Sequence, residues 1–148
     1  MTTAINWEEL VTTSHLEAVT QIKRLIEEQA YEEAHEGVET LRETMSRSER
    51  KALASQLRRL MLHILKWKYQ PQKRSLSWVR SIVDARNEIA DLKEYMPTLN
   101  NQYIKEIWED CSQKAIEGAK AEMNLSRKDI FEPVPLTWHE VFDDEYLL

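Results

Sequence analysis

Apolar residues recur every three or four positions along most of this chain, and this spacing predicts amphipathic α-helices. The best-defined stretch begins at a Ser46-x-x-Glu49 capping box. It continues through apolar residues in steps of four, three, four and three: Leu53, Leu57, Leu60, Ile64 and Trp67. The same steps recur further on: Trp78, Ile82, Ala85, Ile89 and Leu92. A helix this apolar on one side belongs at the centre of a bundle, so we expect the first stretch to form that centre.

Two shorter helices are predicted before this stretch. The first spans residues 14–28, where Ser14 and Glu17 offer a capping box. Its apolar residues share one face: Leu16, Val19, Ile22, Leu25 and Ile26. Trp7 and Leu10 extend this helix backwards. After a short joint at residues 29–31, a second stripe predicts a helix as far as residue 45: Ala34, Val38, Leu41 and Met45.

A fifth helix is predicted after Pro97, which ends the helix before it. Thr98 or Asn100 can cap its start, and its inward positions follow helical spacing: Ile104, Ile107, Trp108, Cys111, Ala115, Ala119 and Met123. Near its end, the small residues Ala115, Gly118 and Ala119 are expected to let another element approach closely.

The chain changes character after residue 124. Phe131, Pro133 and Pro135 predict an extended strap, and Thr137-x-x-Glu140 then caps a short terminal helix. Aromatic and aliphatic side chains are expected to hold this tail on the bundle: Trp138, Phe142, Tyr146 and Leu147.

Composition supports a helical protein, because only 2 Gly and 4 Pro occur in 148 residues. We therefore predict an all-α, single-domain bundle of about five helices over residues 1–148. Residues 1–13 are expected to fray, and residues 126–148 to form the strap with its short terminal helix. The single cysteine, Cys111, excludes an internal disulfide and fits a reducing cytosol. The first residues lack the features of a signal peptide, and no run approaches the roughly 18 apolar residues of a membrane span, so we expect a cytoplasmic protein.

Charge is distributed in three blocks. Residues 1–45 carry ten acids and three bases, residues 47–83 one acid and ten bases, and residues 84–148 fifteen acids and seven bases. The net charges of −7, +9 and −8 sum to the −6 of the whole chain. The basic middle block contains the stretch from His63 to Trp78, which is rich in aromatic, basic and turn residues, so we expect a partner to bind there.

This stretch is predicted to form a corner between two helices. Pro71 disfavours helix at Gln70, so one helix ends there, and Ser75 or Ser77 caps the next helix. The polar residues would satisfy helix-end amides and carbonyls, while two tryptophans fill the space or stack on each other, on Arg74 or on a base. The candidate corner or binding residues are His63, Lys66, Trp67, Gln70, Arg74, Ser75, Ser77 and Trp78. For His63 we expect a structural, hydrogen-bonded imidazole.

Three explanations account for the ten bases of this block. They neutralise acidic helices of the same chain, they bind an acidic protein partner, or they bind the phosphates of a nucleic acid or nucleotide. The candidate phosphate contacts are Arg47, Arg50, Lys66, Lys68, Lys73 and Arg74. The sequence pI of about 5.3 argues against a dedicated nucleic-acid binder.

The same region carries a family resemblance. The carrying residues are Arg47-Ser-Glu-Arg50, His63-x-Leu-Lys-Trp-x-x-Gln-Pro71 and Arg74-Ser-x-Ser-Trp78, followed by Ile82 and Arg86. They resemble the domain-of-unknown-function 29 family, which consists mainly of cyanobacterial proteins of about this length. Weaker similarities follow at Pro97-Thr-Leu99, from Trp108 to Ala119, and at Phe131-x-Pro133-x-Pro135. The resemblance implies a compact all-α fold and brings no established activity.

One part of the chain departs from the pattern of that family. Where the family tends to show an acidic, aliphatic Leu-Ile-Glu-Glu-Ile stretch, this chain has Gly37-Val-Glu-Thr-Leu41 and an extra residue before Arg47.

The sequence motifs of the enzyme classes that we considered are absent or incomplete in this chain. Two glycines leave no phosphate-cradling loop, and Cys111 has no partner at zinc spacing. Glu32-x-x-His35 occurs once, whereas di-iron bundles need two copies. The pairs Glu33-x-x-Glu36 and Glu88-x-x-Asp91 are similar to those of magnesium-dependent nucleotide hydrolases but lie too far apart in sequence. We expect no catalytic residue, metal or cofactor, and a protein that acts through a protein partner. Nucleic-acid or nucleotide binding is the alternative, and a metal-dependent nucleotide hydrolase is a remote one.

Overall fold

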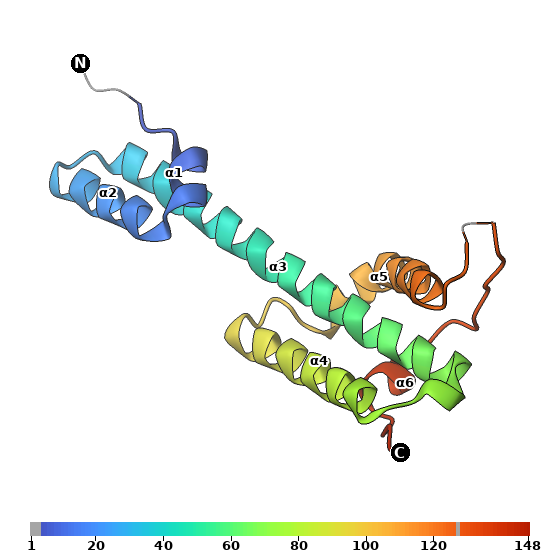
Figure 1. Ribbon diagram of the computed structural model, residues 1–148. Helices are drawn as coiled ribbons and strands as arrows, with labels where there is room; N and C mark the ends of the chain where they lie inside the picture. Colours follow the sequence, from blue (N-terminus) through green and yellow to red (C-terminus); the bar gives the residue numbers. More distant parts are fainter. Residues whose placement is uncertain (1–3, 127) are drawn as a thin grey trace. The chain divides into compact units, whose positions relative to one another are not determined.

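The computed structural model describes residues 4–126 and 128–148, and this part of the chain is built from helices (Figure 1). It contains six α-helices, one 3-10 helix and no strand, which confirms the all-α prediction. In chain order they are α1 (Trp7–Thr13), α2 (His15–Glu27), α3 (Tyr31–Tyr69), η1 (Pro71–Lys73), α4 (Leu76–Tyr95), α5 (Asn101–Glu122) and α6 (Trp138–Phe142).

The contacts of the chain group into two compact units, Met1–Glu49 and Arg50–Leu148. We call them unit 1 and unit 2. The long helix α3 contributes its first part to unit 1 and its second part to unit 2. The prediction of one domain over residues 1–148 stays a prediction.

The predicted break at Ser46 is wrong, because α3 runs without interruption through it. No Pro or Gly lies between residues 38 and 70, and the residues around the expected break are good helix formers such as Arg, Glu, Lys and Ala. Ser46 and Glu49 match a capping box in spacing alone. A cap forms only where backbone N–H groups have lost their partners, and inside a continuous helix these groups remain bonded.

Unit 1 is a small helical assembly around α2 and the first part of α3, which run side by side in opposite directions (Figure 1). Trp7 and Leu10 do not extend α2 backwards as predicted. They belong to a separate helix, α1, because Ser14 adopts an extended backbone conformation and its hydroxyl accepts a hydrogen bond from the Glu17 N–H. In place of a frayed start the structure therefore has α1, and residues 1–3 lie outside the described residues.

Gly37 explains how α1 is attached to α3. A Cβ at this position would lie 2.6 to 2.8 Å from three carbons of the Trp7 ring, so only glycine lets the indole lie flat on the helix. Trp7 is buried there and clusters with Ile22, Leu25 and Ala34. Gly37, which lowers the helix propensity of this segment, is thus the residue against which the buried Trp7 ring packs.

Unit 2 packs the second part of α3 against α4 and α5, which lie on either side of it in Figure 1. The predicted apolar stripe of α3 is buried, and the predicted inner faces of the other two helices supply part of the remaining core. Gly118 allows α5 to approach closely, since a Cβ there would lie 2.6 Å from Leu62 Cδ1. Asn100 caps α5, and Ser75 caps α4.

The C-terminal segment returns to this core. Thr137 and Glu140 form the predicted capping box of α6 with both hydrogen bonds present. Leu136 and Val141 are buried, and Trp138 stacks on Trp108 with ring centroids 5.5 Å apart. Leu147, which we expected to help hold the tail, is instead 71% exposed.

Candidate functional site

The predicted corner exists, and Arg74 joins its two sides. The Arg74 Nε–H donates a 2.9 Å hydrogen bond to the carbonyl of Trp67 in the last turn of α3. Its guanidinium lies 4.7 Å above the centre of the Trp67 ring. Of the stacking partners considered for Trp67, the structure places Arg74 on one side and Tyr146, in an edge-to-face arrangement, on another. Arg74 thus satisfies a helix-end carbonyl, as a corner requires.

The two lysines of the corner are paired within unit 2. Lys66 Nζ lies 3.0 Å from a Glu122 carboxylate oxygen and 4.6 Å from the centre of the Trp78 ring, and its side chain is only 12% exposed. Lys68 Nζ donates a 2.7 Å hydrogen bond to Glu140. Partial burial favours the protonated form of Glu140, but the hydrogen bonds from Lys68 and Thr137 and the charge of Lys68 outweigh it, so the pKa of this carboxyl lies below its usual value.

His63 has the geometry of a structural histidine. Its Nδ1–H donates a 2.8 Å hydrogen bond to the Arg59 carbonyl one turn earlier. Burial lowers the pKa of the imidazole below its ordinary value, and this outweighs the opposing effect of the hydrogen bond to Arg59. The ring is therefore neutral and held in one tautomer near pH 7.

The remaining candidate residues play smaller parts. The Ser75 hydroxyl accepts the Trp78 N–H as the cap of α4, whereas Ser77 lies exposed inside its first turn. Gln70 precedes η1 without a side-chain capping bond, and Lys73 ends η1 in an exposed position. Arg47 reaches Thr44 on the same helix, and Arg50 is exposed on α3. The six candidate phosphate contacts therefore differ in kind, since three are held by neighbours in the corner.

The sequence predicted that Tyr146 helps to hold the tail, but it did not reveal that Arg86 of α4 holds the tail as well. Arg86 donates hydrogen bonds to the carbonyls of Val141 and Glu140, and its guanidinium lies 5.6 Å from the centre of the Tyr146 ring. The Tyr146 hydroxyl donates a 2.7 Å bond to the Glu140 carbonyl. Burial, together with the charges of Asp144 and Glu140, raises the pKa of Tyr146 to about 12. The hydrogen bonds of Arg86 join residues 54 and 55 positions apart, so no local pattern signals them.

Side chains of the types that act as nucleophiles or metal ligands in other proteins do not form a reactive site in unit 2. Cys111 is buried, its thiol lies 3.7 Å from the Ala54 carbonyl, and burial raises its pKa, so it is not a poised nucleophile. Among the residues that the structure describes, no three His, Cys, Asp or Glu side chains gather to hold a metal ion. Glu33 and Glu36 lie on the unit 1 part of α3, and Glu88 and Asp91 on α4 in unit 2.

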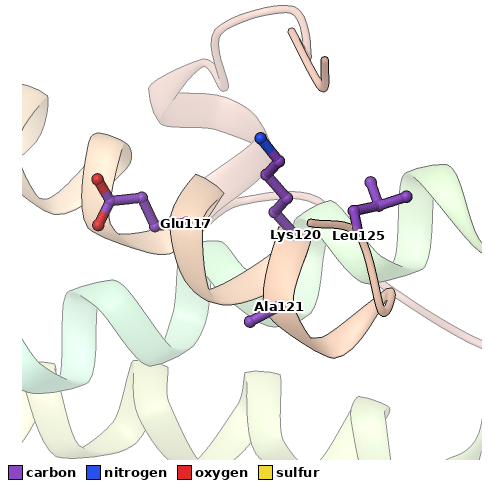
Figure 2. A pocket seen from close by; sticks show the side chains of 4 residues that line it. All are labelled: Glu117, Lys120, Ala121 and Leu125. Carbon is purple, nitrogen blue, oxygen red and sulfur yellow. The ribbon is translucent and has the colours of Figure 1, made fainter. Parts of the chain in front are cut away.

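A hollow of about 550 Å³ lies at the end of α5, lined by Glu117, Lys120, Ala121 and Leu125. Figure 2 shows Lys120 and Leu125 rising from the helix end and Glu117 lying one turn earlier. Within the described residues, its lining comes from α5 and from Leu125, three residues after that helix ends, and supplies one carboxylate and one ammonium group. It therefore lacks the convergent polar groups of a ligand site.

The most unusual surface lies in unit 1, where apolar side chains of two helices are uncovered. We call these six residues the hairpin strip: Leu16, Val19, Ile26, Tyr31, Val38 and Met45. Leu16 is 79% exposed, Val19 49% and Ile26 50%. Of the five apolar residues of α2 that were expected to share one face, only Ile22 and Leu25 are buried. Val38 and Met45 of the next predicted stripe are exposed as well.

The two halves of the hairpin strip lie on the same side. On α2, Val19 and Ile26 each follow a buried residue by one position, and on α3 Val38 follows the buried Gly37. Each residue is turned about 100° round the helix axis from the residue before it. In two antiparallel helices that pack together, the residues one position after the contact residues therefore lie on the same side of the pair. Because the loop between them spans residues 28–30, Ile26 lies level with Tyr31, and Val19 with Val38.

Comparison with protein families identifies the family of this chain. Residues 20–147 match the family described as domain of unknown function DUF29, and the chain belongs to this family. The match confirms the resemblance carried by the corner motif. Searches of the curated proteins and of the solved structures found no match. None of the helices in the described part is long and apolar enough to cross a membrane.

Proposed function

We propose that this protein is a non-enzymatic binding protein, and that its hairpin strip is the surface that takes up a protein partner. The proposal rests on the exposure of six large apolar side chains on a two-helix hairpin. Five of them lie on one side of it, and Leu16 is turned about 60° further round α2 than Val19. Scattered exposed apolar residues are ordinary, but a contiguous line of them over two helices is typical of an interaction surface. The cytoplasmic location expected from the sequence is part of this proposal.

Binding of nucleic acid or nucleotide phosphate is less well supported. Lys66 and Lys68 pair with carboxylates of unit 2, and the Arg74 guanidinium holds the Trp67 carbonyl. A phosphate would have to displace these contacts to use the corner. An acidic partner would meet the same obstacle at Lys66 and Lys68, so an apolar surface is the better candidate.

The test compares the strip with another exposed apolar site. A double variant, Val19→Glu with Val38→Glu, places two charges at the middle of the hairpin strip. Its control, Ile130→Glu with Val134→Glu, charges two exposed residues of the C-terminal strap. Both variants should keep the helix content and melting temperature of the unchanged protein. We expect the strip variant alone to lose the proteins that co-purify from the native cell, and an identical set of co-purifying proteins in all three would contradict the proposal.

A further inference from the structure

A second uncovered apolar line lies on α4 in unit 2. Leu76 is 72% exposed and Val83 is 48% exposed, and the half-buried Val79 lies between them at steps of three and four residues. Leu147 of the tail is also exposed beside a hollow of about 280 Å³ that Val79, Val83 and Tyr146 help to line. We call Leu76, Val79, Val83 and Leu147 the α4 face. It faces away from the unit 2 core, which holds Ile82, Ala85 and Ile89 of the same helix.

The α4 face lies in a basic setting. Residues 73–86 contain four bases, Lys73, Arg74, Arg80 and Arg86, and one acid, Asp84, which gives a net charge of +3. The guanidinium groups of Arg74 and Arg86 contact backbone carbonyls and aromatic rings, so these contacts fix their positions without cancelling their charge. Arg80 pairs with Asp84 at 3.7 Å on the surface, Glu145 lines the neighbouring hollow, and the charge of Asp144 acts on Tyr146. Glu140 also acts on Tyr146 but is paired with Lys68. Against the four bases, the other three acids leave a net charge of +1.

The hairpin strip has the opposite setting, since residues 1–45 carry a net charge of −7. These residues contain three bases, Lys23, Arg24 and Arg42. Arg24 lies 2.8 Å from Glu28, and Arg42 lies 3.9 Å from Glu39. In a contact between two hairpin strips, two segments that each carry a net charge of −7 would face one another, and such surfaces repel. An apolar face surrounded by positive charge would be attracted instead.

We propose that the hairpin strip of one molecule binds the α4 face of a second copy of the same chain. This inference rests on the proposed function and names its partner. The spacing of the two surfaces matches, because Tyr31, Val38 and Met45 recur every seven residues, as do Leu76 and Val83. A seven-residue repeat is the spacing of helices that pack lengthwise. The strip extends over fourteen residues of α3, about 21 Å, and the α4 face over seven residues of α4, about 10 Å, so the α4 face covers about half the length of the strip.

The proposed contact joins two different surfaces, so each copy offers one of each kind. Such head-to-tail contacts make either a closed ring, of which a reciprocal dimer is the smallest, or an open chain. The contact combines apolar burial with charge attraction, so association should strengthen with protein concentration and weaken with salt.

The first measurement is sedimentation velocity of the full chain over a range of concentrations, at about 50 mM and about 500 mM salt, where charge attraction is screened to different degrees. We expect a mass above that of one chain, falling towards one chain at the higher salt. A monomer at every concentration and at both salts would overturn the proposal.

The decisive measurement is complementation between two variants. The strip variant, Val19→Glu with Val38→Glu, keeps an intact α4 face, and the face variant, Leu76→Glu with Val83→Glu, keeps an intact strip. Each alone should sediment as a single chain, because one of the two surfaces is always charged. An equimolar mixture should form a complex of two chains, since an intact strip then meets an intact α4 face. Where a glutamate variant fails to fold, serine at the same positions replaces it.

Three outcomes would overturn the inference. A mixture that stays monomeric contradicts the complementarity, and a face variant that still dimerises points to strip-to-strip contact. Variants that associate like the unchanged protein assign the contact to another surface. The variant Ile130→Glu with Val134→Glu serves as control and should associate as the unchanged protein does. If the mixture stays monomeric but the strip variant still loses its co-purifying proteins, the proposed function stands with a different protein as partner. If the mixture stays monomeric and the strip variant keeps its co-purifying proteins, neither proposal survives.

Discussion

Unit 1 and unit 2 differ in how completely they cover their apolar side chains. Unit 2 holds a core cluster of sixteen buried residues in the described part of the chain, drawn from α3, α4, α5 and the C-terminal segment. The corresponding cluster in unit 1 has four, Trp7, Ile22, Leu25 and Ala34. Both units begin from amphipathic helices of similar quality, so the difference lies in what surrounds them.

The C-terminal tail accounts for much of this difference. In unit 2 it returns to the core and buries Leu136 and Val141, and Arg86 fixes it to α4. Within unit 1, α2 has the first part of α3 and the short α1 as neighbours, and part of its apolar arc stays uncovered. An amphipathic helix with a wide apolar arc needs neighbours on more than one side before its stripe is buried. The comparison therefore separates a surface that the chain leaves uncovered from one that it covers itself.

The largest expected effect is on the separate stability of the two units. Trp7→Ala removes the main buried side chain of unit 1 and should cost about 3–5 kcal/mol, as large aromatic truncations do. Hydrogen exchange should then show loss of protection in α1 and α2, with α4 and α5 still protected. Leu60→Ala, in the core of unit 2, is the reciprocal control. Equal loss of protection in every helix would support one cooperative domain in place of two units.

The two helical glycines should respond in opposite ways to alanine. Gly37→Ala forces the rigid Trp7 ring to move and should destabilise unit 1 by about 1–3 kcal/mol, in spite of the better helix propensity of alanine. At Gly118 the nearest atom is the flexible end of Leu62, so Gly118→Ala should be near neutral. Urea unfolding of both variants gives the comparison. A neutral Gly37→Ala would mean that α1 is not anchored through Trp7.

The corner of unit 2 should prove structural. Arg74→Ala breaks the bond to the Trp67 carbonyl and the stacking on its ring, so we expect a loss of about 1–2 kcal/mol in the free energy of unfolding. Arg80→Ala removes the same charge from an exposed site nearby and should cost little. If thermal melting of the Arg74 variant is unchanged while partner capture is lost, the corner is a binding site instead.

The attachment of the tail should depend on pH at the alkaline end. The pKa of Tyr146 is raised to about 12, so the folded state favours the neutral hydroxyl more than the unfolded state does. This contribution to stability is complete below pH 10 and should be lost as the pH rises towards 12. Tyr146→Phe should cost about 1 kcal/mol near neutral pH and flatten the alkaline decline. An unchanged slope in melting experiments above pH 10 would assign the decline to other groups.

The smallest expected effect concerns the two helix ends with a left-handed residue. Gln29 after α2 and Asn124 after α5 both have positive φ, at 63° and 59°, in the same hydrogen-bonded end motif. Gln29→Gly should stabilise unit 1 by up to about 1 kcal/mol. Asn124→Gly should change unit 2 less, because asparagine tolerates this conformation. Equal gains in melting temperature would show that side-chain contacts at these ends matter more than backbone strain.

The sequence predicted unit 2 better than unit 1 because the signals in unit 2 are local. The stripes of α4 and α5, the caps at Ser75 and Asn100, and the capping box at Thr137 all depend on residues within one or two turns. Arg74 was placed in the corner for the same reason. The salt bridges of Lys66 and Lys68 reach residues 56 and 72 positions away, so the sequence left open whether these lysines were paired or available.

What the sequence determined by itself is the helical class, the apolar side of each helix and the charge of each block. The tertiary structure decided that residues 31–69 form one helix, that Trp7 lies on Gly37, and that Leu16, Val19 and Val38 stay uncovered. Periodicity states which side of a helix is apolar, because that depends on 3.6 residues per turn. Whether that side is buried depends on a neighbour at the same height, and that neighbour comes from elsewhere in the chain or, as proposed for the hairpin strip, from a second copy.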